Sequence, residues 1–398
     1  MHSVPVLRMA LFYFAYFAHV GAFAPYFSLY LQSLGTSALE IGVLLSVTQV
    51  MRIFAPNLWA GLADRSGART ALLRVALGAG TLAWCGVFVT QSFWGLFATL
   101  ALVSFFTSAA LPLFETLLFA LLRDDLGRYG LLRMWGSIGF IVAVLGVGAI
   151  LDVRPVQVLT VLVLAPLLAA FALACTLRDE AVKTEHGADL PVWPVVRRPE
   201  VAALLFACFL MSVAHGPLYT FYSIYLADHG YSKTTVGVLW SLGVVAEIGV
   251  FLLAPRIFMR WSPNAVLIFS FACAMARFAA IGWGVGSLPV LIGAQLLHGA
   301  TFGSYHAAAL GQVNRWFPGG QRSRGQALYM SLSFGAGGMV GGLASGLAWD
   351  SVGAAWTFTG GSVCAALGLI LVAATATMAR GAPPIVGDHT VGRDDAAL

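Results

Sequence analysis

Charged residues are scarce in this chain. They make up 10% of its 398 residues, whereas 59% of the residues are hydrophobic and the mean hydropathy is +0.86. Soluble domains carry about 25% charged residues, so an ordinary soluble domain is excluded. Alternating strands of about ten residues, which mark outer-membrane barrels, are also missing. Because lipid permits only helices or closed barrels, the sequence predicts an all-α membrane protein.

Motifs for catalysis and for cofactor binding are missing as well. The five cysteines stand in separate apolar segments, and none has the spacing of a metal or redox site. There is no Walker motif, no nucleophile elbow and no zinc spacing. We therefore expect no enzymatic activity, no metal site and no cofactor.

Long apolar runs are what the chain has instead. A transmembrane helix needs about 20 mostly apolar residues, and the sequence predicts twelve such helices. Their approximate ranges are 6–31, 39–62, 71–91, 94–122, 132–151, 155–177, 200–227, 234–254, 264–286, 289–312, 325–348 and 353–379. The first run is too long for the core of a signal peptide and has no small-residue cleavage site, so it is interpreted as a spanning helix.

Cationic residues cluster in alternate loops between these spans. The rich loops carry Arg65, Arg69, Arg74, Arg123, Arg128, Arg133, Arg178, Lys183, Arg197, Arg198, Arg256, Arg260, Arg315, Arg322 and Arg324. The opposite loops hold Arg154 and Lys233. By the positive-inside rule the rich side, with both termini, is cytoplasmic. The net charge of +5 thus reflects topology rather than a nucleic-acid partner, and we expect a multi-pass protein of a bacterial-type cytoplasmic (inner) membrane.

The chain repeats itself at an offset of 195 residues. PYFSLYLQSLGTSALEIGVLLS, from Pro25, matches TFYSIYLADHGYSKTTVGVLWS, from Thr220, at several positions. This organisation resembles the major facilitator fold, in which two parallel six-helix repeats enclose a substrate site at mid-membrane. We predict a six-helix bundle at 1–177, a cytoplasmic linker at 178–199, a second six-helix bundle at 200–379 and a disordered cytoplasmic tail at 380–398.

Several ionisable residues lie inside the apolar spans. They are Arg52, Glu115, Glu247, Arg277, His19, His215, His298 and His306. A charge at the bilayer centre costs at least ~2.5–3.5 kcal/mol on insertion scales. Such residues persist where they face a bundle interior or a water-filled path, and there they handle ions, protons or substrate. The pattern therefore favours a transporter.

The first span carries a stripe of aromatic and polar residues. Its members are Tyr16, His19, Phe23, Tyr26 and Tyr30. Their spacing of three and four residues places them on one helical face. Such a face suits a wet substrate cavity, because buried phenol and imidazole groups need hydrogen-bond partners; packing against a neighbouring helix is the alternative. The seventh span offers His215, Tyr219 and Tyr222 as a facing wall.

Glu115 and Arg133 belong to the fourth and fifth spans, which are sequential neighbours, so their side chains can meet on the cavity side. Arginine presents a planar fork that suits carboxylate ligands. We hypothesise that Arg133 anchors an anionic substrate. The alternative is an ordinary positive-inside residue at the start of its helix.

The repeat offset maps Arg52 onto Glu247, at equivalent depths in opposite halves. We hypothesise that Glu247 is the main proton carrier, with Arg277 or a histidine of the tenth span as its modulator. A structural ion pair is the alternative. His298 and His306 lie two turns apart on the tenth span, and histidine titrates near physiological pH; both also suit hydrogen-bonded packing. No acidic or cysteine cluster accompanies them, so a metal site is not expected.

The loop after the second span, GLADRSGAR, resembles the major facilitator signature. It contains Asp64, Arg65, Gly67 and Arg69, with Ala60 where the first glycine of the signature is expected. The resemblance implies a gating latch, in which a carboxylate and a guanidinium hold this loop against helix ends of the other half.

Glu115, followed eighteen residues later by Arg133 at the start of RMWGSIGF, is similar to the lactose permease branch of the superfamily. In that branch such a pair surrounds sugar hydroxyls. The positions of Arg277 and His298 belong to its proton-coupling cluster, and Phe140 stands where that branch has a tryptophan that stacks on the sugar. The resemblance therefore implies that Phe140 lines the substrate site.

This sequence departs from the lactose permease branch at several polar positions. Thr301 stands where that branch has an acid in the tenth span, and Gln295 stands where it has a lysine. Its carboxylates of the seventh span have no match, since His215 is present instead. These departures argue against galactoside transport.

Nearly the whole chain resembles the phenylpropionate permease-like proteins, through AHVGAFAPYFSLYL, RMWGSIGF and QLLHGATFGSYHA. The resemblance implies a monomeric transporter that imports 3-phenylpropionate, an aromatic carboxylate, together with protons. We predict a proton-coupled symporter of a small organic solute that works by alternating access. An oligosaccharide (as in a carbohydrate:proton symporter) or a nucleoside is the alternative substrate. A membrane sensor or lipid-handling protein is the alternative class.

Overall fold

The computed structural model describes residues 6–122, 125–178 and 191–381, and every regular element in these ranges is helical. The first half of the chain forms α1 (Val6–Phe23), α2 (Phe27–Ser33), α3 (Ala38–Ser66), α4 (Arg69–Trp84), α5 (Gly86–Val89), α6 (Phe93–Thr107), α7 (Ala110–Leu122), α8 (Leu126–Val153), η1 (Val156–Val158) and α9 (Leu159–Thr176). The helices beyond the linker begin with α10 (Trp193–Val196), α11 (Pro199–Ala214), α12 (Gly216–Asp228), α13 (Lys233–Arg260) and α14 (Pro263–Gly284). They continue with α15 (Leu288–Leu296), η2 (Gly299–Ser304), α16 (Tyr305–Trp316), η3 (Gly319–Gln321), α17 (Arg322–Met330), η4 (Ser331–Gly337), α18 (Gly338–Val352) and α19 (Ala354–Gly381).

Eleven helical segments of the described chain are long and apolar enough to cross a membrane. The predicted tenth span, 289–312, is helical but is not one of the eleven; it consists of α15, the π-helix η2 and α16. Polar residues such as Gln295 and His298 interrupt its apolar run. Parts of the predicted linker (179–190) and of the predicted tail (382–398) lie outside the described residues.

The first and the seventh spans are each broken in the middle. The first span divides between α1 and α2 around Pro25, and the seventh divides between α11 and α12 next to Pro217. Proline lacks a backbone N–H and crowds the preceding turn, so it breaks or kinks a helix interior. Pro25 and Pro217 therefore account for the two interruptions.

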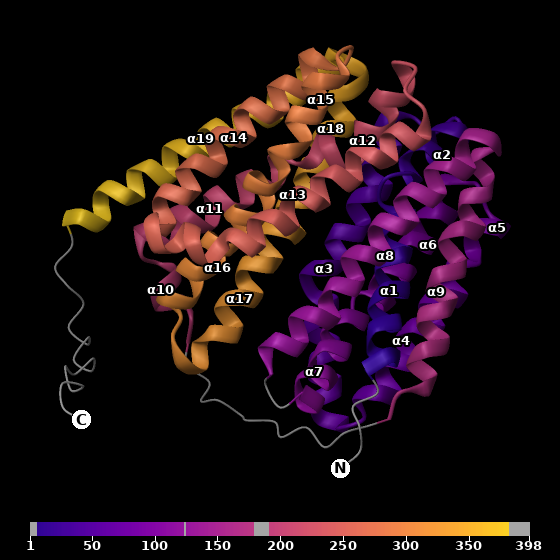
Figure 1. The fold of residues 1–398 in the computed structure, drawn as a ribbon, viewed down its shortest axis with the longest axis horizontal. Helices are drawn as coiled ribbons and strands as arrows, with labels where there is room; N and C mark the ends of the chain where they lie inside the picture. The colour runs from indigo at the N-terminus through magenta and orange to yellow at the C-terminus, as the bar shows by residue number, and fades with distance from the viewer. Residues whose placement is uncertain (1–5, 123–124, 179–190, 382–398) are drawn as a thin grey trace.

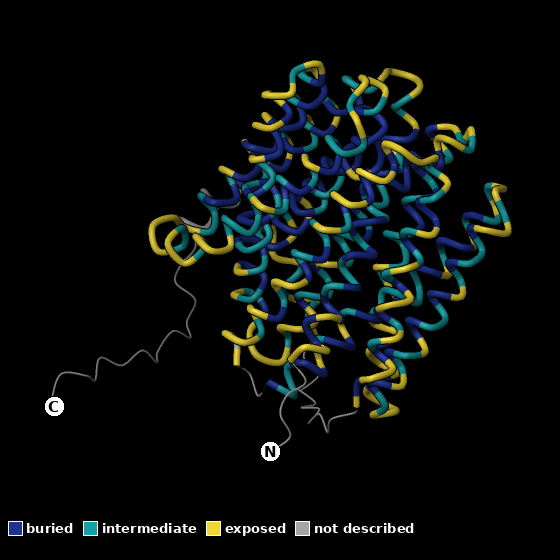
Figure 2. The backbone as a smooth tube through the Cα atoms, turned by 45° about the vertical axis from the view of Figure 1, so that its right-hand side comes forward, coloured by how far each residue is buried: buried dark blue, intermediate teal, exposed yellow. Residues whose placement is uncertain are grey.

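The helices gather into two groups, which are indigo to magenta and orange to yellow in Figure 1. We call α1–α9 the first half and α11–α19 the second half. Contacts between the halves join α3 to α18, α8 to α13, and α2 to α12. Buried residues run through the interior of both groups (Figure 2). Large apolar side chains are exposed on the outside, as a lipid-facing surface requires; examples are Leu82, Trp94, Leu252 and Ile370.

The end of the molecule where α1 begins and where Arg65 and Arg128 lie is the end predicted to be cytoplasmic, and we call the opposite end the outer end. At the outer end the halves are joined directly. Asp152 accepts hydrogen bonds from the backbone N–H groups of Lys233 (2.7 Å) and Thr234 (3.0 Å). The hydroxyl of Tyr26 lies 2.8 Å from the carbonyl oxygen of Val144 and 3.2 Å from that of Lys233.

Glycine lets α3 and α18 approach closely in the same region. A Cβ at Gly42 would lie 2.8 Å from the carbonyl oxygen of Gly342 and 2.9 Å from the Cα of Gly346. Among pairs of described residues, the hydrogen bond between the halves nearest the cytoplasmic end joins Ser331 to the carbonyl oxygen of Ile53, about midway along α3. The halves are therefore held together at the outer end, whereas the cytoplasmic part of α3 continues beyond these bonds.

Candidate functional site

A charged cluster in the first half centres on Glu115 of α7. Its Oε1 lies 3.7 Å from Nε of Arg133. The same oxygen accepts hydrogen bonds from the hydroxyls of Tyr13 (3.3 Å) and Tyr129 (3.2 Å). Helices α1, α7 and α8 thus supply one carboxylate, one guanidinium and two phenols to one place. The predicted meeting of Glu115 and Arg133 is present in the structure.

Arg133 is held by aromatic rings as well as by charge. Its guanidinium lies 4.2 Å from the ring centre of Phe17 and 5.5 Å from that of Tyr13, distances at which a cation is attracted to an aromatic face. The side chain of Arg133 remains 35% exposed and that of Glu115 27% exposed. The pair is therefore ordered but still accessible from one side.

A second polar cluster surrounds Arg277 of α14, which is fully buried. Its Nε donates to the carbonyl oxygen of Ala294 (3.0 Å), and its Nη1 donates to Oγ1 of Thr301 (3.0 Å). Its Nη2 donates to Oε1 of Gln295 at 3.2 Å. Nη1 also lies 3.4 Å from Nε2 of His215. Every acceptor in this set is neutral, although a buried charge is costly without compensation.

The contact with Arg277 determines the tautomer of His215. Arginine only donates hydrogen bonds, so Nε2 of His215 is the acceptor and carries no proton. The proton then resides on Nδ1, which lies 2.8 Å from the carbonyl oxygen of Met211 and donates to it. His215 is therefore a neutral structural partner of Arg277.

Glu247 of α13 faces the tenth span. Its Oε2 lies 3.9 Å from Nε2 of His298. The ring of Phe302 stacks on His298 (5.4 Å between centres) and on His306 (6.3 Å), so the two predicted histidines share one face of the segment. His306 ends this row at Tyr329, with Nδ1 lying 3.0 Å from the hydroxyl.

Long-range electrostatics link the two clusters across the halves. Arg52 of α3 interacts with Tyr16 of the first half and with Tyr219 of the second. Glu247 is likewise an electrostatic neighbour of Arg133. Arg52, Arg133 and Glu247 therefore each lie within electrostatic range of a group in the opposite half.

The predicted face of the first span is divided in the structure. His19 packs inside the first half, where Nδ1 lies 3.1 Å from the carbonyl oxygen of Val163. Phe23 stacks on Phe27 and contacts the ring of Trp84. These two residues follow the packing alternative, because α4 and α9 cover that side of α1. Tyr16 turns towards the charges.

Tyr26 and Phe140 lie in the contacts between helices. The hydroxyl of Tyr26 takes part in the outer junction described above. Phe140 is half-buried, and its backbone lies against Gly21, where a Cβ would meet its carbonyl oxygen at 2.6 Å. Tyr219 and Tyr222 pack around Trp240, with ring centres 6.0 and 6.2 Å away. The facing wall predicted for the seventh span is thus built with α13.

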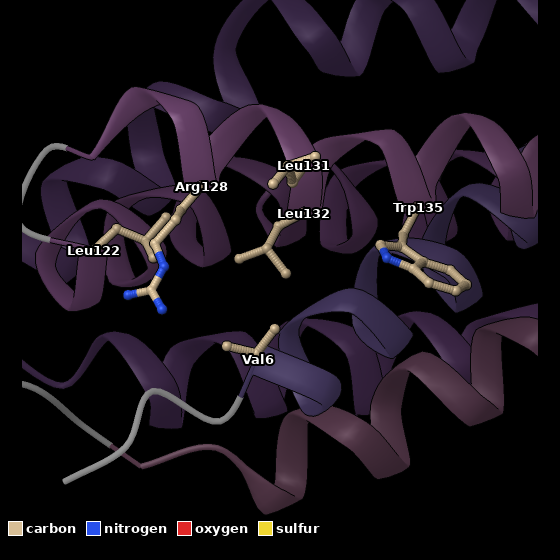
Figure 3. Close-up of a pocket in the computed structure, with 6 residues that line it drawn as sticks. All are labelled: Val6, Leu122, Arg128, Leu131, Leu132 and Trp135. Carbon is tan, nitrogen blue, oxygen red and sulfur yellow. The ribbon is translucent and has the colours of Figure 1, made fainter.

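Figure 3 shows a pocket at the cytoplasmic end of the first half. It is lined by Val6, Leu122, Arg128, Leu131, Leu132 and Trp135. None of the predicted site residues lines it, and its lining is apolar apart from Arg128. The polar clusters, rather than this pocket, have the chemistry of a transport site.

Comparison with known proteins identifies the family. Residues 6–360 match the description of the MFS_1 like family. The chain belongs to this family of major facilitator transporters. It is therefore a multi-pass membrane transporter and not an enzyme, as the sequence predicted.

Relatives and structures agree with this membership. The "Probable 3-phenylpropionic acid transporter" of Escherichia coli (strain K12) is 31% identical over 82% of this chain and 86% of its own. The "Maltose permease" of Geobacillus stearothermophilus is 27% identical over 91% of this chain and 92% of its own. The crystal structure of the nucleoside transporter NupG is 17% identical, with a TM-score of 0.81 over 95% of this chain and 100% of that one. This last likeness confirms the major facilitator fold.

In this major facilitator protein the ion pair that the structure describes in the signature segment lies within the first half. Asp64 pairs with Arg69 of the same loop at 3.0 Å. Gly67, with φ +68°, ends α3 in the left-handed region, and Arg65 is exposed in the last turn of that helix. A latch between the halves needs their cytoplasmic ends to meet, and the junctions described above lie towards the outer end.

Several residues of the two clusters were not in the predicted site. Tyr13 and Tyr129 bind Glu115, and Gln295 and Thr301 bind Arg277. Tyr129 precedes Arg133 by four residues on one helix, and this spacing places both side chains on one face. The spacing could therefore have indicated Tyr129 as a site residue. Thr301 and Gln295 were noted only as departures from lactose permease, since neutral side chains carry no charge signal.

Proposed function

We propose that this transporter is a proton-coupled symporter that imports a small aromatic carboxylate such as 3-phenylpropionate across a bacterial cytoplasmic (inner) membrane as a monomer. The observation that carries the proposal is the arrangement of two polar clusters, one in each half, that face a common region. The name of the relative at 31% identity supports the substrate class. The aromatic rings of Phe17, Tyr16 and Tyr219 beside these clusters suit an aromatic solute.

Glu247 is the proposed proton carrier, with His298 as its modulator. The two side chains are within 3.9 Å of each other, and a proton held by either changes the charge that the other meets. Glu247 also lies within electrostatic range of Arg133 across the halves. A proton on Glu247 therefore alters the electrostatics of the region in which substrate binds, which is what coupling requires.

Alternating access would follow from the junctions between the halves. The outer end is closed by Asp152, Tyr26 and the approach of α3 to α18. In the proposed cycle these contacts break when the halves rock, and the cytoplasmic ends then meet. The signature loop with Asp64 and Arg65 would form its latch in that second state.

A hydroxyl-rich solute is the second candidate substrate. Glu115 accepts hydrogen bonds from two phenol hydroxyls, and a carboxylate that binds hydroxyls in this way suits a sugar or nucleoside. The maltose permease relative, matched over 91% of this chain, supports this candidate. Its test runs beside that of the first.

The experiment measures the external pH of a lightly buffered, de-energised suspension of cells that express the protein. Addition of 3-phenylpropionate should make the medium alkaline, and Glu247→Gln should abolish the response. Glu200→Gln, in the first turn of α11, is the matched control and should respond as wild type. Alkalinisation with maltose alone would replace the aromatic acid by the sugar candidate, and a normal response of Glu247→Gln would remove Glu247 from the coupling.

A further inference from the structure

Arg277 holds a positive charge in the second half that no acid of the described chain neutralises at short range. The ion pairs among described residues join Asp64 to Arg69, Glu115 to Arg133, and Glu247 to His298; they do not include Arg277. Its four hydrogen-bond partners are neutral. Arg133, by contrast, already has a carboxylate within 3.7 Å. A transported anion is therefore compensated more favourably beside Arg277 than beside Arg133.

The orientation of Gln295 follows from its contact with Arg277. A guanidinium has donors and no acceptor, so the amide oxygen of Gln295 must face it, as observed at 3.2 Å. The amide nitrogen, Nε2, is thereby turned to the other side. There it is buried, since only 3% of the residue is exposed, and it has no hydrogen-bond partner. A buried donor left in this way costs about 1–3 kcal/mol.

Tyr222 of α12 presents a second unpartnered group at the same place. Its hydroxyl is buried without a hydrogen bond, and only 1% of the residue is exposed. Gln295 is its polar neighbour, yet neither this hydroxyl nor the amide nitrogen of Gln295 has a partner at hydrogen-bond distance. Two buried donors from α12 and α15 therefore converge next to a guanidinium.

Neighbouring helices pack closely around these two donors. Gly243 of α13 lies against Gln295, where a Cβ would come within 3.3 Å of the amide oxygen. Immediately after α15 the chain enters the π-helix η2, a local irregularity that is frequent at functional sites. Thr301, within η2, is itself a ligand of Arg277.

We propose that Gln295 and Tyr222 bind the carboxylate of the transported acid, beside Arg277. Nε2 of Gln295 can only donate and the phenol of Tyr222 donates readily, so the group that satisfies both is an acceptor. The adjacent guanidinium selects a negatively charged acceptor over a neutral one. This inference rests on the proposed function, since it names the part of the substrate that the second half recognises.

The test compares an acid with its neutral amide on purified full-length protein. Binding of 3-phenylpropionate and of 3-phenylpropanamide is measured by calorimetry at fixed pH. Wild type should prefer the acid. Tyr222→Phe should weaken binding of the acid about tenfold or more, because a hydrogen bond to a charged group is lost, and should affect the amide much less. Tyr225→Phe, whose hydroxyl bonds the carbonyl oxygen of Gly282, is the matched control on the same helix and should change neither.

Gln295→Glu separates recognition from structure. The new carboxylate pairs with Arg277 and repels the acid, so acid binding should be lost while amide binding persists. Loss of both ligands in Gln295→Glu, together with equal effects of Tyr222→Phe on acid and amide, would overturn the subsite. If wild type binds the acid and Tyr222→Phe binds it as tightly as Tyr225→Phe does, the proposed subsite is wrong and the proposed function stands. A wild type that binds neither 3-phenylpropionate nor benzoate overturns both.

Discussion

The carboxylate of Asp152, near the end of α8, accepts a hydrogen bond of 2.7 Å from the backbone N–H of Lys233, the first residue of α13. Helix N-termini have unpaired N–H groups and a partial positive charge. One half of the transporter thus caps a helix of the other half. This cap lies at the outer junction, so its energy biases the protein towards the state in which that junction is closed.

We expect Asp152→Asn to increase the population that opens to the outside. The substitution removes the negative charge at the helix N-terminus, and capping interactions of this kind contribute about 0.5–2 kcal/mol. Accessibility of single cysteines at the outer end to a membrane-impermeant thiol reagent measures the shift. Asp350→Asn, an exposed acid in α18, is the control. Equal accessibility in both variants would show that the cap does not bias the equilibrium.

Gly42→Ala should also open the outer junction. The added Cβ would lie within 3.0 Å of backbone atoms of Gly342 and Gly346, so α3 and α18 must separate. Gly61, on the same helix, has nothing within 4 Å of its Cβ position, and Gly61→Ala should be tolerated. The same thiol assay distinguishes the two variants. A Gly42→Ala protein that is as closed as Gly61→Ala would contradict the packing of this seam.

Arg277→Lys should lower the thermal unfolding midpoint of the purified protein, although it keeps the charge. Lysine lacks the planar fork and cannot reach Ala294, Gln295 and Thr301 together, so at least one buried acceptor loses its donor, at about 1–3 kcal/mol. Arg256→Lys, at an exposed arginine of α13, is the control. If the two variants unfold at the same temperature, the neutral contacts of Arg277 contribute little to stability.

Much of the charged site was predictable because the membrane makes charge conspicuous. Glu115 and Arg133 stood out as ionisable groups near apolar spans, and their helices are sequential neighbours, so their meeting followed from the sequence. The partners of Arg277 could not be found in this way. Gln295 and Thr301 are neutral, and only the packing of α14 against α15 and η2 brings them to the guanidinium.

The sequence by itself determined the membrane class and the helical spans, because hydropathy is a property of each segment of the chain. Proline geometry is also local, so the breaks at Pro25 and Pro217 follow from the sequence as well. The internal repeat indicated the family. Only the tertiary structure decided which side of α1 is packed and which side faces charge. It placed His19 against α9, turned Asp64 back to Arg69, and directed the amide nitrogen of Gln295 towards Tyr222. Helical periodicity states which residues share a face, but the neighbours that cover that face come from distant parts of the chain.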